Sequence, residues 1–274
     1  MLREREPMAS ELLGRRENQL YIKPHPLLRR YIAHYTVTFP GTEPLPAQLS
    51  LIPDASGCLV FTCSNMGIQG EYWGSTTQVV VVENDANKVP MRLFVEFLPG
   101  GAHRIMGFPQ DETTDIQLPL DVLNPALERS ICGRIEAAAD LGGLLRSLDE
   151  IMLSQMGLSQ GNQFLDRLFR GTQRAPAIPT VRDLTEGTCY SERHLNRLFH
   201  QSVGMSMKVY LRLLRINRAV LAMERGGKSF TRLAQDLGYY DQAHFIHDFQ
   251  RVCGVAPKDY MKNLSVFYNE TYKF

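Results

Sequence analysis

Short apolar runs separated by turn-forming residues occupy the first part of the chain. Four of them are rich in β-branched and aromatic side chains, namely residues 31–39, 58–62, 78–82 and 91–98. Clusters of proline, glycine, asparagine and aspartate lie between these runs. Short strands with frequent turns predict a β-sandwich or a small barrel in this region.

Helical periodicity replaces this pattern further along the chain. Apolar residues share one stripe of a helix in two segments: Leu141, Leu144, Leu145, Leu148, Ile151 and Met152, then Phe164, Leu165, Leu168 and Phe169. Two amphipathic helices beside a barrel can form a dimer seam, or they can pack on their own barrel. Both interpretations stay open.

The last hundred residues repeat one pattern at a fixed interval of 50 positions. The repeated positions are a polar residue, two apolar anchors, a glycine and a tyrosine: Ser191 and Asp241, Leu195 and Phe245, Phe199 and Phe249, Gly204 and Gly254, Tyr210 and Tyr260. In each copy the polar residue can cap a helix whose apolar positions face a core. The repeat therefore predicts two helix-turn-helix units.

The outward positions of the second helix in each unit carry side chains suited to reading DNA bases. They are Arg193, Asn196 and Arg197 in the first unit, and Gln242, His244 and His247 in the second. Arginine can donate two hydrogen bonds to guanine, and asparagine can pair in the same way with adenine. Solvated surface positions are the alternative for any one helix, but the repetition favours a DNA-reading role.

One long segment without glycine or proline, residues 206–225, connects the two units. Twenty helical residues span about 30 Å, and successive major-groove faces lie about 34 Å apart. A rigid helix here can therefore place the two units one DNA turn apart. Lys208, Arg212 and Arg215 on this helix are candidates for phosphate contacts.

The net charge of the first 170 residues differs in sign from that of the remainder. Residues 1–170 carry 15 Lys and Arg against 20 Asp and Glu, a net of −5, whereas residues 171–274 carry 15 against 9, a net of +6. A basic half favours a nucleic-acid module joined to a second domain. Five scattered cysteines, no signal-peptide pattern and no membrane-length apolar run predict a cytoplasmic protein with free thiols and no membrane partner.

The C-terminal part resembles the AraC/XylS family of bacterial transcription regulators. The residues that carry this resemblance are the segment Leu233-Ala-Gln-Asp-Leu-Gly238-Tyr239, Phe245, Phe249, Gly254-Val-Ala-Pro257 and Tyr260. The resemblance implies a DNA-binding domain with two helix-turn-helix motifs, and it places the six outward residues at base-reading positions. It also implies double-stranded DNA as a partner, with a small-molecule effector, RNA polymerase and a second copy of the chain as further partners.

The N-terminal half resembles, more loosely, the cupin-like sensor domains of the same family, through Ile52-Pro-Asp54 and the segment from Val95 to His103. His25, His34 and His103 do not form the clustered ligand set of a metal cupin, so neither a metal nor another cofactor is expected. Five aromatic residues are candidates for an effector pocket, although core packing is an alternative for each: Phe61, Tyr72, Trp73, Phe94 and Phe97.

The expected fold is α+β with two domains, a cupin-like β-barrel or sandwich with flanking helices and an all-α double helix-turn-helix joined by a linker helix. The expected parts are an arm (1–18), a sensor and dimerisation domain (19–170), a linker (171–179), a DNA-binding domain (180–264) and a tail (265–274). The predicted function is effector-controlled, sequence-specific transcription regulation rather than catalysis. The alternatives are an N-terminal domain that only oligomerises, and a DNA-modifying enzyme with a zinc site for which Cys58 and Cys63 alone supply too few cysteines.

Overall fold

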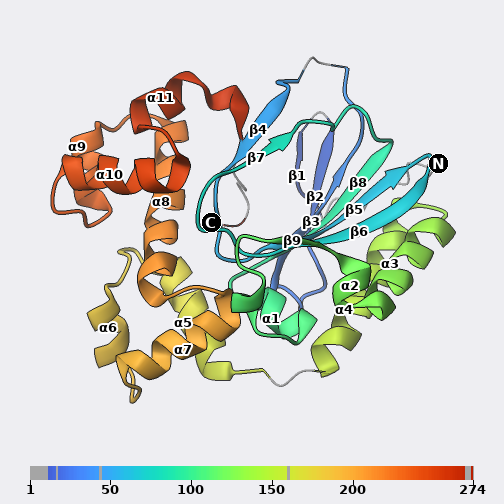
Figure 1. Ribbon diagram of the computed structural model, residues 1–274, viewed down its shortest axis with the longest axis horizontal. Coiled ribbons are helices and arrows are strands. Elements are labelled where there is room, and N and C mark those ends of the chain that lie inside the picture. Colours follow the sequence, from blue (N-terminus) through green and yellow to red (C-terminus); the bar gives the residue numbers. More distant parts are fainter. Residues whose placement is uncertain (1–11, 17, 43–44, 159–160, 269–272, 274) are drawn as a thin grey trace.

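The computed structural model describes residues 12–16, 18–42, 45–158, 161–268 and 273. Figure 1 shows a sheet-rich N-terminal half, blue to green, beside a helical C-terminal half, yellow to red. Most strands precede the helices along the chain, with two short strands as exceptions, so the fold is α+β, as the sequence predicted. No helix among these residues is long and apolar enough to span a membrane.

Within the described residues, strands of the N-terminal half and one strand from the C-terminus form two sheets. The larger sheet has the order β1-β2-β3-β8-β5-β6-β9, and the smaller has the order β10-β4-β7. Paired strands are antiparallel, apart from β10 and β4, which run parallel. The strands are β1 (Leu12–Arg16), β2 (Gln19–Ile22), β3 (Ile32–Thr38), β4 (Gln48–Leu51), β5 (Cys58–Ser64), β6 (Gly67–Trp73), β7 (Val80–Glu83), β8 (Met91–Phe97), β9 (Gln117–Pro119) and β10 (Phe267–Tyr268).

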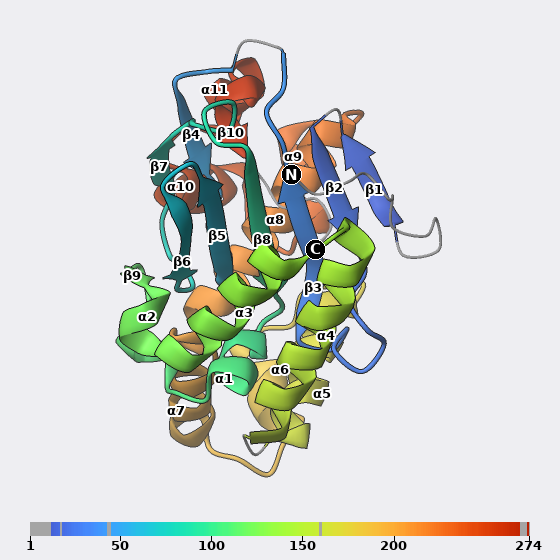
Figure 2. The same ribbon diagram turned by 90° about the vertical axis from the view of Figure 1, so that its right-hand side faces the viewer.

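One face of the larger sheet is covered by helices and forms the N-terminal core. On β8, Leu93, Val95 and Phe97 are fully buried on this face, because successive side chains of a strand point to opposite sides. Figure 2 shows α3 and α4 lying across the sheet. The helices of this half are α1 (Gly101–Met106), the short 3-10 helix η1 (Gln110–Glu112), α2 (Leu120–Leu123), α3 (Pro125–Ala137) and α4 (Leu141–Leu158).

The two predicted amphipathic stripes are covered within the chain, but by different partners. On α4 the stripe packs against the sheet, with Leu144, Leu148 and Met152 in the N-terminal core. On α5 (Gln163–Arg174) the stripe packs against the C-terminal helices instead, through Leu165 and Phe169. A dimer seam along either stripe would first have to break these contacts.

The C-terminal half is built around one long helix. Ser206 caps its start, and Leu213, Ile216 and Val220 are buried along it. Figure 1 shows this helix, α8, running from the region of α6 and α7 to that of α9, α10 and α11. The helices are α6 (Val181–Glu186), α7 (Glu192–Val203), α8 (Met207–Arg225), α9 (Phe230–Asp236), α10 (Gln242–Cys253) and α11 (Pro257–Lys262), followed by the 3-10 helix η2 (Leu264–Val266).

Three segments that were expected to lack regular structure contain strand or helix residues. Residues 12–16 of the predicted arm form β1, paired with β2 at the edge of the larger sheet; residues 1–11 and 17 of that arm lie outside the described part. Helix α5 continues to Arg174 and so takes up part of the predicted linker. The predicted tail contributes β10, which pairs with β4 of the N-terminal half. Only β10 depends on a partner distant in the sequence, because β1 pairs with the adjacent β2 and α5 is held by hydrogen bonds within the helix.

Candidate nucleic-acid interface

The first helix-turn-helix is α6 followed by α7, and side chains cap both helices. Thr180 and Asp183 form a reciprocal capping box at the start of α6. Ser191 Oγ accepts a hydrogen bond from a backbone N–H in the first turn of α7 at 3.3 Å. These caps fix where each helix begins. Leu195 and Phe199 are fully buried, so one face of α7 is held in the core and the opposite face is left to solvent.

Two of the three residues expected to read bases from α7 are exposed, and the third has a structural partner. Arg193 and Arg197 are exposed. The Oδ1 atom of Asn196, in contrast, accepts a hydrogen bond from the backbone N–H of Met207, the first residue of α8, at 3.0 Å. A bidentate contact with adenine uses both the oxygen and the nitrogen of the carboxamide. Asn196 would therefore have to give up this cap in order to read a base.

The second helix-turn-helix, α9 followed by α10, repeats the arrangement. Asp241 caps α10 by accepting a backbone hydrogen bond at 2.7 Å. Gly238 lies in the turn with a φ of 75°, a left-handed conformation that favours glycine. Phe245 and Phe249 are fully buried beside Ala234, which is also fully buried and small enough to let the two helices pack closely.

The outward face of α10 differs from that of α7. His244 and His247 are exposed, and Gln242 Oε1 accepts a hydrogen bond from the Thr231 hydroxyl at 2.6 Å. Nε2 of His244 lies 4.0 Å from the carboxylate of Asp248. The two faces therefore offer different hydrogen-bonding groups, arginines on one helix and imidazoles on the other.

Of the three cationic candidates on α8, two are engaged within the protein. Arg212 forms an ion pair with Asp248 of α10 at 3.2 Å, with the two side chains only 16% and 10% exposed. The Arg215 guanidinium lies 5.8 Å from the centre of the Tyr239 ring. Lys208 is exposed. Arg212 and Arg215 thus hold α8 against the second unit, and Lys208 is the more accessible candidate for a phosphate contact.

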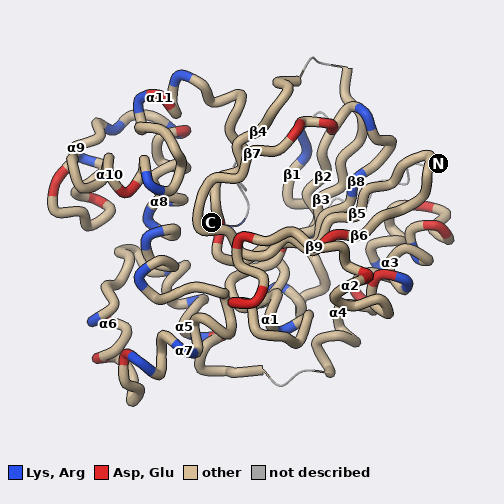
Figure 3. The backbone as a smooth tube through the Cα atoms, viewed as in Figure 1, with Lys and Arg blue, Asp and Glu red and all other residues tan. Residues whose placement is uncertain are grey.

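The spacing and charge of the two units suit a DNA duplex. The 19 residues of α8 span about 28 Å, which is comparable to the distance of about 34 Å between successive major-groove faces. Figure 3 shows Lys and Arg recurring along α8 and in the units at both of its ends. A helix of this length can place the two capped helices at adjacent major-groove faces.

Comparisons with known proteins agree with this geometry. The family described as "Helix-turn-helix domain" matches residues 184–263. Residues 184–263 are an AraC-type helix-turn-helix domain. The chain is 28% identical over 86 residues to an uncharacterized helix-turn-helix-type transcriptional regulator of Haemophilus influenzae, which covers 31% of this chain and 29% of that protein. It is 35% identical over 69 residues to the transcriptional activator RhaR of Yersinia pseudotuberculosis, covering 25% and 24%.

These curated relatives are matched over only about a quarter of their length. Among solved structures, apo ToxT from Vibrio cholerae is similar over 83% of this chain and 97% of that one, with a TM-score of 0.42 and 10% sequence identity. ToxT bound to an unsaturated fatty acid is similar over 84% and 90%, with a TM-score of 0.39 and 10% identity.

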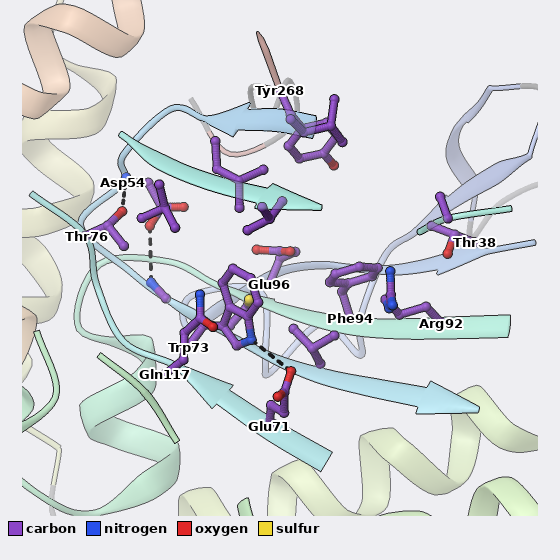
Figure 4. Close-up of a pocket in the computed structure, with 18 of the residues that line it drawn as sticks. Thr38, Asp54, Glu71, Trp73, Thr76, Arg92, Phe94, Glu96, Gln117 and Tyr268 are labelled. Atoms are coloured by element: carbon purple, nitrogen blue, oxygen red, sulfur yellow. Dashed lines mark hydrogen bonds between the residues drawn. The ribbon is translucent and has the colours of Figure 1, made fainter. Parts of the chain in front are cut away.

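A cavity of about 550 Å³ lies between the two sheets of the N-terminal half, on the side of the larger sheet that faces away from α3 and α4. Of the five aromatic residues expected to line a pocket, Trp73 and Phe94 do so (Figure 4). Phe61, Tyr72 and Phe97 do not line it and are fully buried in the core on the opposite face. Strand alternation explains the division, because neighbouring residues on a strand point to opposite sides.

Charged residues that the sequence did not single out line the same cavity. The acidic ones are Asp54, Glu71, Glu83, Asp85 and Glu96, and the basic ones are Arg92 and Lys273. Arg92 donates hydrogen bonds to both carboxylate oxygens of Asp85 at 2.8 Å, and these bonds lower the pKa of Asp85. A charged residue at alternate positions of an apolar strand, such as Arg92 and Glu96 on β8, was the available signal for a polar lining. No group of three or more His, Cys, Asp and Glu side chains within the described part could hold a metal ion.

One lysine from the C-terminal tail reaches into this cavity. Lys273 Nζ lies 2.6 Å from Asp54 Oδ2 and 2.8 Å from Glu96 Oε2, and its side chain is 1% exposed. Burial acts to raise the pKa of Asp54, but the Lys273 ammonium and hydrogen bonds from Ser56 outweigh it, so this pKa is lowered. Local sequence patterns gave no signal for the contact, since the two residues are 219 positions apart.

The segment from Ser75 to Val79, beside the cavity, contacts the ends of both recognition helices of the AraC-type domain. Ser75 Oγ donates to the carbonyl of Val203, at the end of α7, at 2.8 Å. The backbone N–H of Val79 donates to the carbonyl of Val252, near the end of α10, at 3.0 Å. Thr76, between them, lines the cavity. A five-residue segment therefore joins the cavity wall to both helices.

Proposed function

We propose that the protein is a sequence-specific DNA-binding transcription regulator whose N-terminal domain senses a small molecule in the cavity between its sheets. The observation that carries the proposal is the pair of capped recognition helices, α7 and α10, each anchored by buried side chains and open on its outer face. Phosphate contacts supply most of the affinity of such a protein for DNA, and base contacts supply its specificity.

The two recognition helices support different roles at the DNA. Arg193 and Arg197 on α7 suit guanine, through hydrogen bonds to O6 and N7. His244 and His247 on α10 present one imidazole each, with a smaller set of donors and acceptors. A single chain of this kind would contact two unlike segments of an asymmetric site.

Control by an effector rests on the connection between the cavity and the helices. A ligand that changes the position of the Ser75–Val79 segment would change the relative placement of α7 and α10, because that segment is hydrogen-bonded to both. Such coupling is reciprocal, so bound DNA must change the affinity for the ligand by the same factor.

Two further partners belong to the proposal. The resemblance to a transcriptional activator supports a contact with RNA polymerase. A homodimer would use a surface other than the apolar stripes of α4 and α5, which are covered within the chain. Sedimentation of the protein with and without a DNA site would show whether one or two chains bind.

The test compares Arg197→Ala with Arg129→Ala on a selected DNA site and on DNA of random sequence. Arg197 is exposed on α7, whereas Arg129 is exposed on α3 and serves as the matched control. Loss of a bidentate base contact should weaken specific binding by about 1–3 kcal/mol, roughly 5- to 150-fold. Random-sequence binding should change much less, and Arg129→Ala should change neither.

Equal losses of Arg197→Ala on both DNAs would mean that Arg197 touches only phosphates. Failure of the wild-type chain to select any site from a genomic library would remove the proposed function itself.

A further inference from the structure

We propose that the cavity between the two sheets binds an organic cation, a primary amine on an apolar body, in the place that the Lys273 ammonium occupies. The proposal deepens the proposed function by assigning the chemical class of the effector. It concerns the end of the cavity formed by Asp54, Glu96 and Gly57, which we call the ammonium site.

The ammonium site has the composition that a buried primary amine requires. The Lys273 Nζ lies within 2.6 Å of Asp54 Oδ2, 2.8 Å of Glu96 Oε2 and 3.4 Å of the Gly57 carbonyl. An ammonium has three N–H donors and no acceptor, so three surrounding oxygens satisfy it. A buried charge is tolerated only when it is paired in this way.

The N-terminal domain holds the Asp54 carboxylate in place by contacts of its own and buries Glu96 beside it. Asp54 Oδ1 accepts hydrogen bonds from the Ser56 N–H at 2.7 Å, the Ser56 hydroxyl at 2.8 Å and the Gly57 N–H at 3.1 Å, which leaves Oδ2 to the cavity. Glu96 is on the central strand β8, between β3 and β5, and is 6% exposed. Without a cation, two buried carboxylates would lie close to each other, which is unfavourable. The site therefore selects for positive charge.

The remainder of the cavity suits an apolar body larger than a lysine side chain. Trp73, Phe94 and Tyr268 contribute aromatic surface to its lining, and aromatic faces attract cations. The other cation in the lining, Arg92, is paired with Asp85 through two hydrogen bonds. With a volume of about 550 Å³, the cavity falls in the size range of small-molecule sites.

Lys273 connects this site to the second helix-turn-helix. The tail that carries Lys273 follows α11. In this tail, the Phe267 ring packs on the Tyr260 ring of α11 with ring centres 4.7 Å apart, and the backbone of Phe267 pairs with that of Ser50 in β4. Lys273 is thus a competitor tethered to the AraC-type domain, with an effective concentration of the order of millimolar. An amine that occupies the ammonium site must displace Lys273, and it thereby loosens the connection between the cavity and the second unit.

The experiment is a chemical rescue of the full-length Lys273→Ala variant. This variant removes the ammonium and leaves both carboxylates, so its melting temperature should fall. n-Propylammonium, which corresponds to the Cγ, Cδ, Cε and Nζ atoms that the substitution removes, should restore it, whereas n-propanol, of the same shape without the charge, should not. Calorimetry with phenethylamine should give an affinity for Lys273→Ala at least about tenfold higher than for the wild type, because the tethered competitor is gone. 2-Phenylethanol and phenylacetate should not bind.

A second variant guards against a folding defect. Lys273→Ala with Glu96→Gln has one carboxylate fewer at the site and should fold without the repulsion, yet should bind phenethylamine at least about tenfold more weakly than Lys273→Ala. Equal binding of the amine and the alcohol, or amine binding that is unchanged by Glu96→Gln, would overturn the proposal.

DNA binding is measured separately on a selected site. If the amine fails to bind while DNA binding is intact, the ammonium site is refuted and the proposed DNA-binding function stands. If the amine binds and rescues the variant but the chain selects no DNA, the ammonium site stands and the proposed function fails.

Discussion

Gly204, at the end of α7, offers a direct test of how the N-terminal half holds the first recognition helix. Its φ is 78°, and a Cβ placed there would lie 2.0 Å from Thr114 Oγ1, 2.9 Å from the Gln110 carbonyl oxygen and 2.9 Å from Ser75 Oγ. All three atoms belong to the N-terminal half. Gly204→Ala therefore strains the backbone of the helix end and pushes on the contact between the two halves. Gly238 is the matched control, because its φ is 75° and a Cβ there meets nothing within 4 Å.

The expected magnitudes differ between these two glycines. A left-handed alanine costs about 1–2 kcal/mol, and this should be the whole effect of Gly238→Ala on the free energy of unfolding. Gly204→Ala should add about 1 kcal/mol for the hydrogen bond from Thr114 Oγ1 to the Gly204 carbonyl, 2.8 Å long. Crowding against the Gln110 backbone should add about another 1–3 kcal/mol. The total for Gly204→Ala is about 3–6 kcal/mol.

The assay is urea unfolding followed by two signals. The single tryptophan, Trp73, lies in the cavity wall and reports on the N-terminal half, while far-ultraviolet circular dichroism reports mainly on the helices. In Gly204→Ala the two transitions should separate, because the contact between the halves is damaged. In Gly238→Ala, which leaves that contact intact, the two transitions should still coincide, at a lower urea concentration than in the wild type. If the two variants lower the free energy of unfolding equally and the two signals still change together in both, the first unit does not depend on its contact with the N-terminal half.

Three further predictions concern side chains in other parts of the fold. Cys189 is exposed whereas burial raises the pKa of Cys253 to about 12, so a thiol reagent at neutral pH should label Cys189 quickly and Cys253 only on unfolding; equal rates would contradict this. Asn196→Ala should cost about 0.5–2 kcal/mol of stability through the lost cap, and Asn196→Asp, which keeps an acceptor, should recover most of it in urea unfolding. The difference in the free energy of unfolding between the wild type and Lys273→Met should be largest at neutral pH, because pairing with Lys273 lowers the pKa of Asp54 in the folded protein. The stabilisation by ionised Asp54 is present above its ordinary pKa of 3.8 and is lost as the pH falls through its lowered pKa in the folded protein. A difference that grows in acid would contradict the ion pair.

The sequence was most informative where its pattern was local and repeated. The polar cap, the two apolar anchors and the turn glycine of each unit lie within one or two helical turns, and Ser191, Leu195 and Phe199 have the predicted roles. The strands that were not predicted have weaker patterns. Glycines at 67 and 70 interrupt β6, and β4 is only four residues long.

The five aromatic residues predicted to line a pocket lie on two different faces of the larger sheet, because side chains alternate along a strand. Tyr72 and Trp73 are adjacent on β6, and Phe94 and Phe97 are three apart on β8, so each pair has one member on each face. A period of two predicts this division without a structure, but not which face is the cavity. The pairing of Lys273 with Asp54 depends on the tertiary fold, and no sequence pattern gives it.

In the proposed function, one chain reads two unlike segments of DNA with α7 and α10. The most direct measurement is a hydroxyl-radical footprint on a selected site, made with the wild type, Arg197→Ala and His247→Ala. Two protected segments about 10–10.5 base pairs apart and of different sequence are expected, and each substitution should relax base preference in one segment only. A palindromic site read by one helix from each of two chains, or a base preference that both substitutions relax in the same segment, would contradict it.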